Sequence, residues 1–335
     1  MKNSKLLKNP FFAFLKLIRI ENLLIIAFTA YMIRYGIIES LLFFNGQKLY
    51  LQQSAFDFFV LVLSILLIAA AGYIINDYFD IKTDRINHPD TVVIDKSIKR
   101  RWAMFSHVLF NILGVALGFW VGWKAGNYKI GIIHLLASGL LWYYSTHFKK
   151  QLIIGNLVVS LLCAFIPLLV LVFEMPSVIQ IYSIFFPDQI MEFNYLYKYV
   201  FGFTLFAFLT SLIREIIKDM EDITGDTETG CETIPVVWGV RTAKAILLGI
   251  ISNTLLLLFF IIYQLWKSIP ITQVELIQIA YLGIGLIIPI FFLTGKVINA
   301  KTSADYHKAS SLVKIIMLIG INFSAVIYYL ANYAS

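Results

Sequence analysis

Residues 76–84 read NDYFDIKTD and follow directly on a long apolar segment, in a chain that is otherwise poor in carboxylates. A second acidic run, DMEDITGD at residues 219–226, follows another apolar segment in the same way. A charged side chain at bilayer depth costs roughly 2.5 to 3.5 kcal/mol, so carboxylates gathered at the end of a membrane helix indicate a site. Together the two runs predict a site in which several carboxylates bind Mg²⁺, and hence a diphosphate substrate.

The composition predicts a polytopic membrane protein. The chain is 59% hydrophobic and 14% charged over 335 residues, against roughly 25% charged residues in an average soluble domain. Nine apolar segments come near the roughly 20 residues that a helix needs to cross a bilayer. They are residues 16–34, 55–76, 102–123, 128–146, 152–174, 197–218, 242–264, 275–295 and 311–332. We therefore expect an all-α fold with nine transmembrane helices in a single integral-membrane domain, residues 1–335.

The basic residues predict the orientation, because cytoplasmic loops carry the excess of Lys and Arg. With the N-terminus inside, 21 of the 27 basic residues fall on the inner side, Lys2, Lys5 and Lys8 among them, and 6, including Arg34, on the outer side. This places both acidic runs in the cytoplasm and the C-terminus outside, in the plasma membrane of a bacterial or archaeal cell. The inner basic band faces anionic membrane lipids and explains the net charge of +7 without nucleic acid.

Helical spacing places the acids of each run on one face. Asn76, Asp80 and Asp84 are spaced i, i+4, i+8, with Asp77 beside them. In the second run the expected stripe begins near the end of the apolar segment and continues into the run, with Glu215, Asp219, Asp222 and Asp226 on one face. Mg²⁺ takes hard oxygen ligands and is usually held by one or two carboxylates plus substrate phosphates, which fits two sparse acidic stripes.

Basic side chains beside the acids are candidates for binding the remaining phosphate oxygens, because Arg and Lys form charge-assisted hydrogen bonds to phosphate. These substrate-binding candidates are Arg85, Lys149, Arg214 and Lys218.

At these residues the chain resembles the UbiA-type intramembrane prenyltransferases, whose first motif reads NDxxDxxxD and whose second contains DxxxD. The matching positions are residues 76–84 and 222–226. The order of the motifs, their place after the second and sixth predicted helices and the orientation also agree. Within the family the chain is most similar to the digeranylgeranylglyceryl phosphate synthase branch, on residues 72–80, 155–160, 214–219 and 233–235.

The resemblance implies nine helices around a central cavity that opens to the cytoplasmic side, and it implies roles for single residues. Asn76, Asp77, Asp80 and Asp84 would hold one Mg²⁺, while Asp222 and Asp226 would hold a second. Asp219 would bind or orient the acceptor, which leaves Asp80, Asp219 and Asp222 as the expected catalytic carboxylates. Tyr144 with Lys149 would engage the diphosphate, and Asn22, near Arg19, would line the same cavity.

The implied reaction begins when an allylic prenyl diphosphate ionises and an acceptor attacks C1. Two acceptor classes stay open: a geranylgeranylglycerol phosphate-type lipid, whose hydroxyl would form an ether, and an aromatic ring, which would be alkylated on carbon. A third alternative, from a different class, is an ion-coupled transporter, since intramembrane acids also mark ion pathways. The position of the acids at helix ends rather than mid-span disfavours transport.

Overall fold

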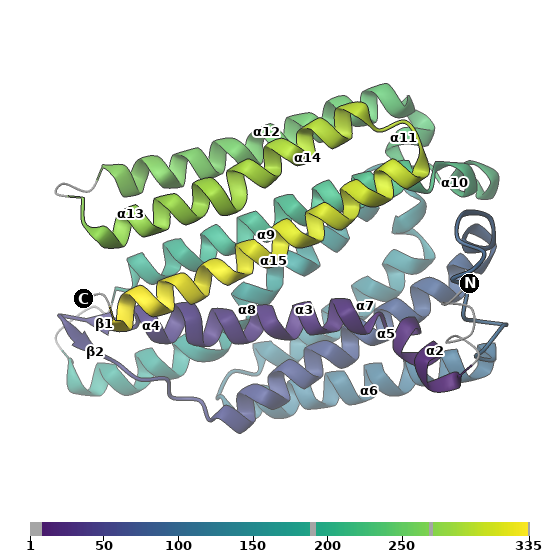
Figure 1. Cartoon of the computed structure of the whole chain (residues 1–335). Coiled ribbons are helices and arrows are strands. Elements are labelled where there is room, and N and C mark those ends of the chain that lie inside the picture. Colours follow the sequence, from purple (N-terminus) through teal and green to yellow (C-terminus); the bar gives the residue numbers. More distant parts are fainter. Residues whose placement is uncertain (1–8, 188–191, 268–270, 334–335) are drawn as a thin grey trace.

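Long helices run between two ends of the molecule in this computed structural model, which describes residues 9–187, 192–267 and 271–333 (Figure 1). The predicted all-α class is confirmed. The long helices are α3 (Ile20–Tyr31), α5 (Ala55–Asn87), α6 (Arg100–Lys124), α7 (Lys129–Thr146), α8 (Ile154–Phe185), α9 (Asn194–Glu221), α12 (Gly239–Trp266), α14 (Ile288–Asn299) and α15 (Ser303–Tyr333).

Short elements extend or connect these helices. They are α2 (Pro10–Leu17), the π-helical η1 (Met32–Ile38), α4 (Glu39–Leu41), the hairpin β1 (Phe43–Phe44) and β2 (Gln47–Lys48), η2 (Phe148–Lys150), α10 (Ile223–Thr229), α11 (Ile234–Val237), α13 (Gln273–Ala280) and the π-helical η3 (Tyr281–Ile287). The helices α2, α10 and α11 lie at one end of the bundle, and the hairpin lies at the other, where α15 finishes (Figure 1).

Eight helices of the described ranges are long and apolar enough to cross a membrane. They correspond to eight of the nine segments predicted from the sequence. The remaining segment forms α7, but this helix has only 18 residues and includes Lys129 and His134, and it is not among the eight. The protein is thus an integral membrane protein with several apolar helices. The orientation argument also used Lys2, Lys5 and Lys8, which lie outside the described residues.

The prediction that the fifth segment ends at Glu174 is wrong, because α8 continues through Pro167 and Pro176 to Phe185. A proline inside a helix leaves the carbonyl four residues earlier without its usual donor. For Pro176 that carbonyl belongs to Val172, and the side-chain amide of Asn127 donates to it at 3.2 Å. A partner from the loop before α7 therefore replaces the lost bond, and the helix continues.

Arg34 was expected on the outer side of the membrane, but its side chain is buried inside the bundle. Its Nε lies 2.7 Å from Oε1 of Glu174, and the two side chains are 2% and 0% exposed. The guanidinium also donates to the backbone oxygen of Gln53 at 2.6 Å and lies 4.4 Å from the centre of the Phe58 ring. This ion pair ties η1 to α8 in the half of the bundle that is remote from the acidic motifs.

Arg19 separates α2 from α3 and adopts the left-handed conformation, with φ 50° and ψ 57°. This region is uncommon for a residue with a Cβ atom, and such strain persists only where the surroundings fix it. The guanidinium is fixed on one side by Asp77, at 2.7 Å, and on the other by the Tyr73 ring, at 5.0 Å. The break thus turns a cationic side chain from the first membrane helix toward α5.

Candidate active site

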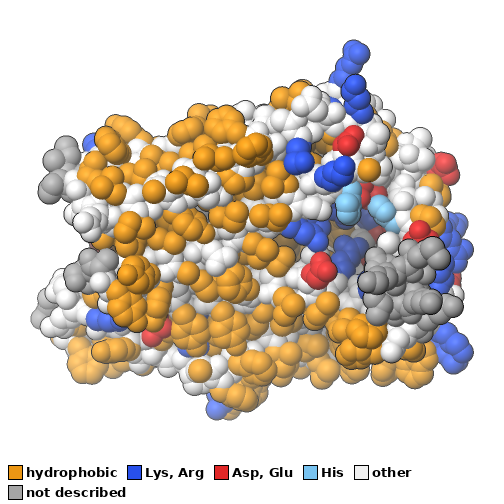
Figure 2. All heavy atoms as spheres, in the orientation of Figure 1, with side chains coloured by type: hydrophobic (Ala, Val, Ile, Leu, Met, Phe, Trp, Pro, Cys, Tyr) orange, Lys and Arg blue, Asp and Glu red, His pale blue; other side chains and the backbone are white. Residues whose placement is uncertain are grey.

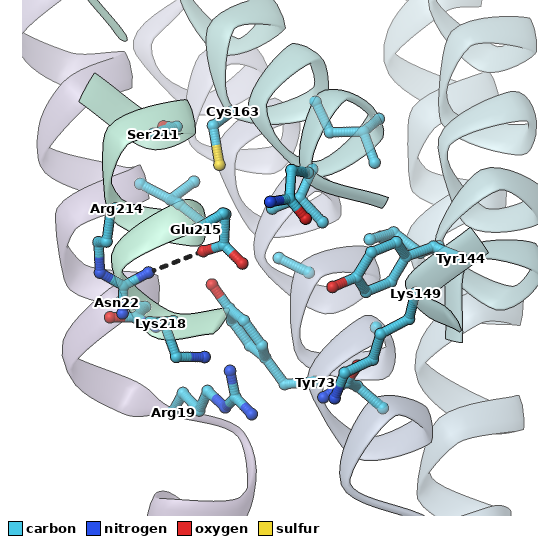
Figure 3. Close-up of a pocket in the computed structure, with 18 of the residues that line it drawn as sticks. Arg19, Asn22, Tyr73, Tyr144, Lys149, Cys163, Ser211, Arg214, Glu215 and Lys218 are labelled. Atoms are coloured by element: carbon cyan, nitrogen blue, oxygen red, sulfur yellow. Dashed lines mark hydrogen bonds and ion pairs between the residues drawn. The ribbon is translucent and has the colours of Figure 1, made fainter. Parts of the chain in front are cut away.

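One pocket brings the two acidic motifs together with basic and aromatic side chains from distant parts of the chain (Figure 3). It lies among α3, α5, α7, α8, α9 and α15. Its polar lining includes Arg19, Asn22, Asn76, Asp84, Tyr144, Lys149, Asn156, Arg214, Glu215, Lys218, Asp219, Asp222, Asp226 and Lys314. Farther along, the lining is apolar, with Ile65, Ile68, Ile133, Leu141 and Leu169.

The first motif lies on the last turns of α5, where the i, i+4 spacing sets its side chains on one face. The Asn76 amide donates to Oδ2 of Asp80 at 2.7 Å, and the Lys149 ammonium donates to the same oxygen. Asp80, predicted as a catalytic metal ligand, is buried at 9% exposure and is not among the lining residues. The structure places it as the anchor of Lys149, while Asn76 and Asp84 line the pocket itself.

Lys149 follows α7 in the short helix η2 and is held against the first motif. Burial alone would lower its pKa, but the charge of Asp80, the nearby Tyr144 and the hydrogen bond to Asp80 together raise the pKa above its usual value. The side chain is therefore a fixed cation at the mouth of the pocket. Tyr144, in the last turn of α7, lies beside it (Figure 3).

Asp77 is bound by Arg19. Its carboxylate forms the ion pair with Arg19, and it does not line the pocket. Although Asp77 was predicted as a ligand of the first Mg²⁺, its position indicates that it orients Arg19.

The second motif does not continue as one straight stripe, because α9 ends at Glu221 and α10 begins at Ile223. Asp219, Asp222 and Asp226 nevertheless all line the pocket. Burial and the neighbouring Asp222 carboxylate raise the pKa of Asp226 to about 6, against the charge of Lys149. Burial would also raise the pKa of Asp222, but the hydrogen bond from His88 and the charge of Lys218 hold it below its usual value.

Asn87, the last residue of α5, clasps the two motifs together. Its side-chain amide donates to the Asp222 carbonyl at 2.9 Å, and its Oδ1 accepts from the Gly225 N–H at 2.8 Å. His88 adds a contact of 2.7 Å to Oδ1 of Asp222. A Cβ atom at Gly225 would come within 2.5 Å of the Asn87 amide nitrogen. Only glycine allows this close approach, so the relative position of the motifs depends on it.

The oxygen donors in the pocket fit a divalent cation of the Mg²⁺ type. Oδ1 of Asn76 is buried and has no hydrogen-bond partner in the described part of the chain. It shares the pocket with the carboxylates of Asp84, Asp222 and Asp226. Within those described residues, no three acidic, His or Cys side chains come close enough to hold a metal by themselves. This sparse set suits Mg²⁺, which completes its shell with water and substrate phosphate oxygens.

Comparison with known proteins places this geometry in a family. The sequence profile of the UbiA prenyltransferase family matches residues 23–315. The chain belongs to the UbiA prenyltransferase family. Its curated relatives include two digeranylgeranylglyceryl phosphate synthases. That of Methanosphaera stadtmanae is 30% identical over 77% of this chain and 82% of its own length, and that of Methanothermobacter thermautotrophicus is 28% identical over 79% and 83%. The predicted resemblance is confirmed.

Solved structures show the same UbiA fold. A structure described for digeranylgeranylglyceryl phosphate synthase in membranes matches with a TM-score of 0.58, covering 97% of this chain and 99% of that one at 22% identity. A UbiA homolog from Archaeoglobus fulgidus bound to DMAPP and Mg²⁺ matches with a TM-score of 0.55, covering 93% and 99% at 17% identity. The family match and the curated relatives show that the chain is a prenyltransferase, and the transporter alternative is set aside.

We expect the clasp to matter for the prenyltransferase activity. Gly225→Ala should push the Asn87 side chain aside and break both of its hydrogen bonds, lowering kcat/KM for the donor by roughly 10-fold to 100-fold, the range for groups that orient metal ligands. Asn87→Ala should cause a loss of similar size. Kinetics of the double variant test the coupling: a loss no greater than that of either single variant indicates one shared function, whereas losses that multiply would show that the clasp is not one unit.

Arg85 is the one phosphate-binding candidate that lies away from the UbiA pocket, within the described residues. Its guanidinium lies 3.4 Å from Asp95 and is 55% exposed. We therefore expect Arg85→Ala to change the rate of prenyl transfer by less than about threefold, since exposed ion pairs contribute little. A loss near that of an acidic-motif variant, measured in the same membranes, would place Arg85 at the substrate after all.

Sequence reasoning assigned no role to several polar residues of this UbiA pocket. Asn156 on α8 donates to Oδ2 of Asp219 at 2.7 Å and so orients that carboxylate. Lys314 on α15 lines the pocket from the last membrane helix. Both are polar residues near one end of an apolar segment, and this position can be read from the sequence. Nothing in the sequence indicates that they face this pocket rather than the lipid.

Proposed function

We propose that this UbiA prenyltransferase transfers a prenyl group from an isoprenoid diphosphate to the free hydroxyl of a geranylgeranylglycerol phosphate-type lipid. The observation that carries the proposal is a single pocket in which two acidic motifs and Lys149 adjoin a long apolar lining. The polar part suits a diphosphate with its metal ion, and the apolar part suits an isoprenoid tail. The curated synthases named above support the choice of a lipid acceptor.

The donor diphosphate would lie between the two motifs. Asn76, Asp84, Asp222 and Asp226 would hold Mg²⁺. The A. fulgidus homolog bound to DMAPP and Mg²⁺ supports the presence of this ion. Bound Mg²⁺ neutralises charge on a leaving diphosphate. Lys149 would donate to a phosphate oxygen, and Asp80 keeps its ammonium in place.

In the reaction, the bond between C1 and the diphosphate oxygen breaks, and the electron pair leaves with the diphosphate. The acceptor oxygen bonds to C1 and gives up its proton. Asp219, which Asn156 orients, is the carboxylate we assign to the hydroxyl and its proton. Isoleucine and leucine side chains enclose the allylic carbons and keep water from capturing the cation.

The topology we propose is nine membrane helices, with α7 as the ninth span beside the eight apolar ones, in one domain over residues 1–335. The acidic end then faces the cytoplasm of a bacterial or archaeal cell, with the N-terminus inside and the C-terminus outside. The excess of basic residues on that side supports this orientation.

A membrane assay with geranylgeranyl diphosphate and geranylgeranylglyceryl phosphate tests the proposal. We expect formation of the diether phosphate that stops when EDTA removes the divalent cation and returns when Mg²⁺ is added in excess. Aromatic acids are offered in parallel as acceptors. Transfer to an aromatic ring alone would refute the lipid acceptor while leaving the enzyme class intact, and full activity in EDTA would refute the role of the metal.

A further inference from the structure

The pocket has a second charged wall, opposite the one that carries Lys149. We define the cationic edge as Arg19, Arg214, Lys218 and Lys314, which all line the pocket. Figure 3 shows Arg19, Arg214 and Lys218 on one side of the pocket and Tyr144 with Lys149 on the other, with Tyr73 between them. The edge gathers side chains from the start of α3, from α9 and from α15.

The cationic edge has more positive charge than its own partners neutralise. Asp77 pairs closely with Arg19 at 2.7 Å, and Glu215 lies 3.2 Å from Arg214. Nε of Arg214 is nevertheless buried without a hydrogen-bond partner among the described residues. A buried donor without an acceptor is costly, so it indicates a ligand that supplies one.

The two lysines of the edge are less well neutralised than the arginines. Lys314 reaches only Glu21, at 4.0 Å, and the side chain of Glu21 is 86% exposed. Within the described residues, no carboxylate lies at ion-pair distance from Lys218. Like charges also repel within the edge, since its four cations line the same pocket. A bound anion would remove this repulsion.

The position of the edge distinguishes it from the donor site. The wall with the acidic motifs offers oxygen ligands for a metal, which a diphosphate leaving group requires. The cationic edge offers guanidinium and ammonium donors, which bind a phosphate monoester directly. It also lies between α3 and α15, and Figure 2 shows basic side chains around a hollow in this face of the molecule. A lipid that approaches through the bilayer would reach it with its headgroup.

We propose that the cationic edge is a second anion subsite, which binds the phosphate monoester of the lipid acceptor separately from the donor diphosphate. The inference rests on the proposed function and makes it more specific. Binding the acceptor phosphate at Lys218 and Lys314 sets the glycerol hydroxyl toward Asp219, since Lys218 and Asp219 both line the pocket from the end of α9. The phosphate is then the feature by which the enzyme selects its acceptor.

The test is steady-state kinetics of the full-length protein in liposomes, with Lys218→Gln and Lys314→Gln. Geranylgeranylglyceryl phosphate is compared with the same ether alcohol without its phosphate. Each variant should raise KM for the phosphorylated acceptor by roughly 10-fold to 100-fold, as expected for a lost charge-assisted hydrogen bond. For Lys314→Gln, KM for the donor, kcat at saturating acceptor, and all constants with the dephosphorylated acceptor should stay within about twofold. Lys218→Gln also removes a charge that acts on Asp222, so its readout is the ratio of KM for the phosphorylated acceptor to KM for the dephosphorylated one. Lys308→Gln, an exposed lysine on the same α15, is the matched control.

Three results would overturn the inference, and they differ from failure of the proposed function. A higher KM for the donor in Lys314→Gln would assign the edge to the diphosphate. Equal use of the phosphorylated and dephosphorylated lipids by the unmodified enzyme would show that no phosphate is recognised. Equal losses on both lipids would show that the lysines act structurally. If no glycerol lipid accepts a prenyl group while an aromatic acid does, the proposed function fails and the subsite with it.

Discussion

Asp84→Asn and Asp226→Asn, made separately, are each expected to lower the rate of prenyl transfer by at least about a hundredfold, the scale on which removal of one electrostatic group from an active site acts. Both carboxylates line the pocket beside the unpartnered Oδ1 of Asn76. Asparagine keeps the size of the side chain and removes its charge. The loss should therefore arise from weaker binding of the cation and its diphosphate rather than from altered packing.

The measurement is transfer of labelled prenyl groups in membranes, repeated over a range of Mg²⁺ concentrations. Each variant should require more Mg²⁺ for its half-maximal rate. Asp90→Asn serves as the control, because Asp90 follows the first motif in the sequence but is exposed and lies outside the pocket. Activity within about threefold of the unmodified enzyme at saturating Mg²⁺ would show that neither carboxylate serves the metal site.

Arg34→Met should destabilise the protein by about 3 to 5 kcal/mol, because it leaves the charge of Glu174 buried without its partner. Glu174 is fully buried, and the guanidinium of Arg34 is its ion-pair partner. The double variant, with Glu174→Leu as well, should recover most of this loss. Replacing both members of a buried pair by apolar side chains is often neutral or even stabilising.

The measurement is the stability of the single and double variants in a mild detergent, with unfolding induced by heat or by a denaturing detergent. Arg100→Met supplies the matched control, since Arg100 forms a pair with Asp95 at 2.8 Å in which the side chains are 54% and 32% exposed. Such a surface pair contributes about 0 to 1 kcal/mol. A double variant that is as unstable as Arg34→Met alone would mean that the lost contacts to Gln53 and Phe58, rather than the uncompensated charge, cause the effect.

Much of the fold could be predicted because a membrane helix is recognised from the length and hydropathy of one contiguous segment. Eight of the nine apolar segments form helices that meet the length and hydropathy needed to span a bilayer. The boundaries were less accurate. Glu174 and Pro176 indicate a break, yet α8 passes through both, because Arg34 of η1 pairs with Glu174 and Asn127 of the loop before α7 donates to the Val172 carbonyl. Both partners are distant from residue 174 in the sequence, so the local sequence does not indicate them.

The site was predicted in part for the same reason. Asn76, Asp80 and Asp84 are one helical turn apart, so their common face follows from the regular rise of α5. The different tasks of these residues do not follow from spacing. Lys149 forms an ion pair with Asp80, and Arg19 forms one with Asp77. Each basic residue comes from a segment that is distant from the acidic run in the sequence.

The sequence by itself determined the membrane class, the two acidic motifs and the family to which they belong, because each depends on residues within a few turns of one another. The tertiary structure alone decided which of those acids face the pocket, that Asn87 clasps Gly225 across 138 residues, and that Arg19 meets Asp77 across 58. Contacts between helices depend on how the helices pack and rotate against each other. That arrangement depends on the whole bundle, and no local stretch of sequence contains it.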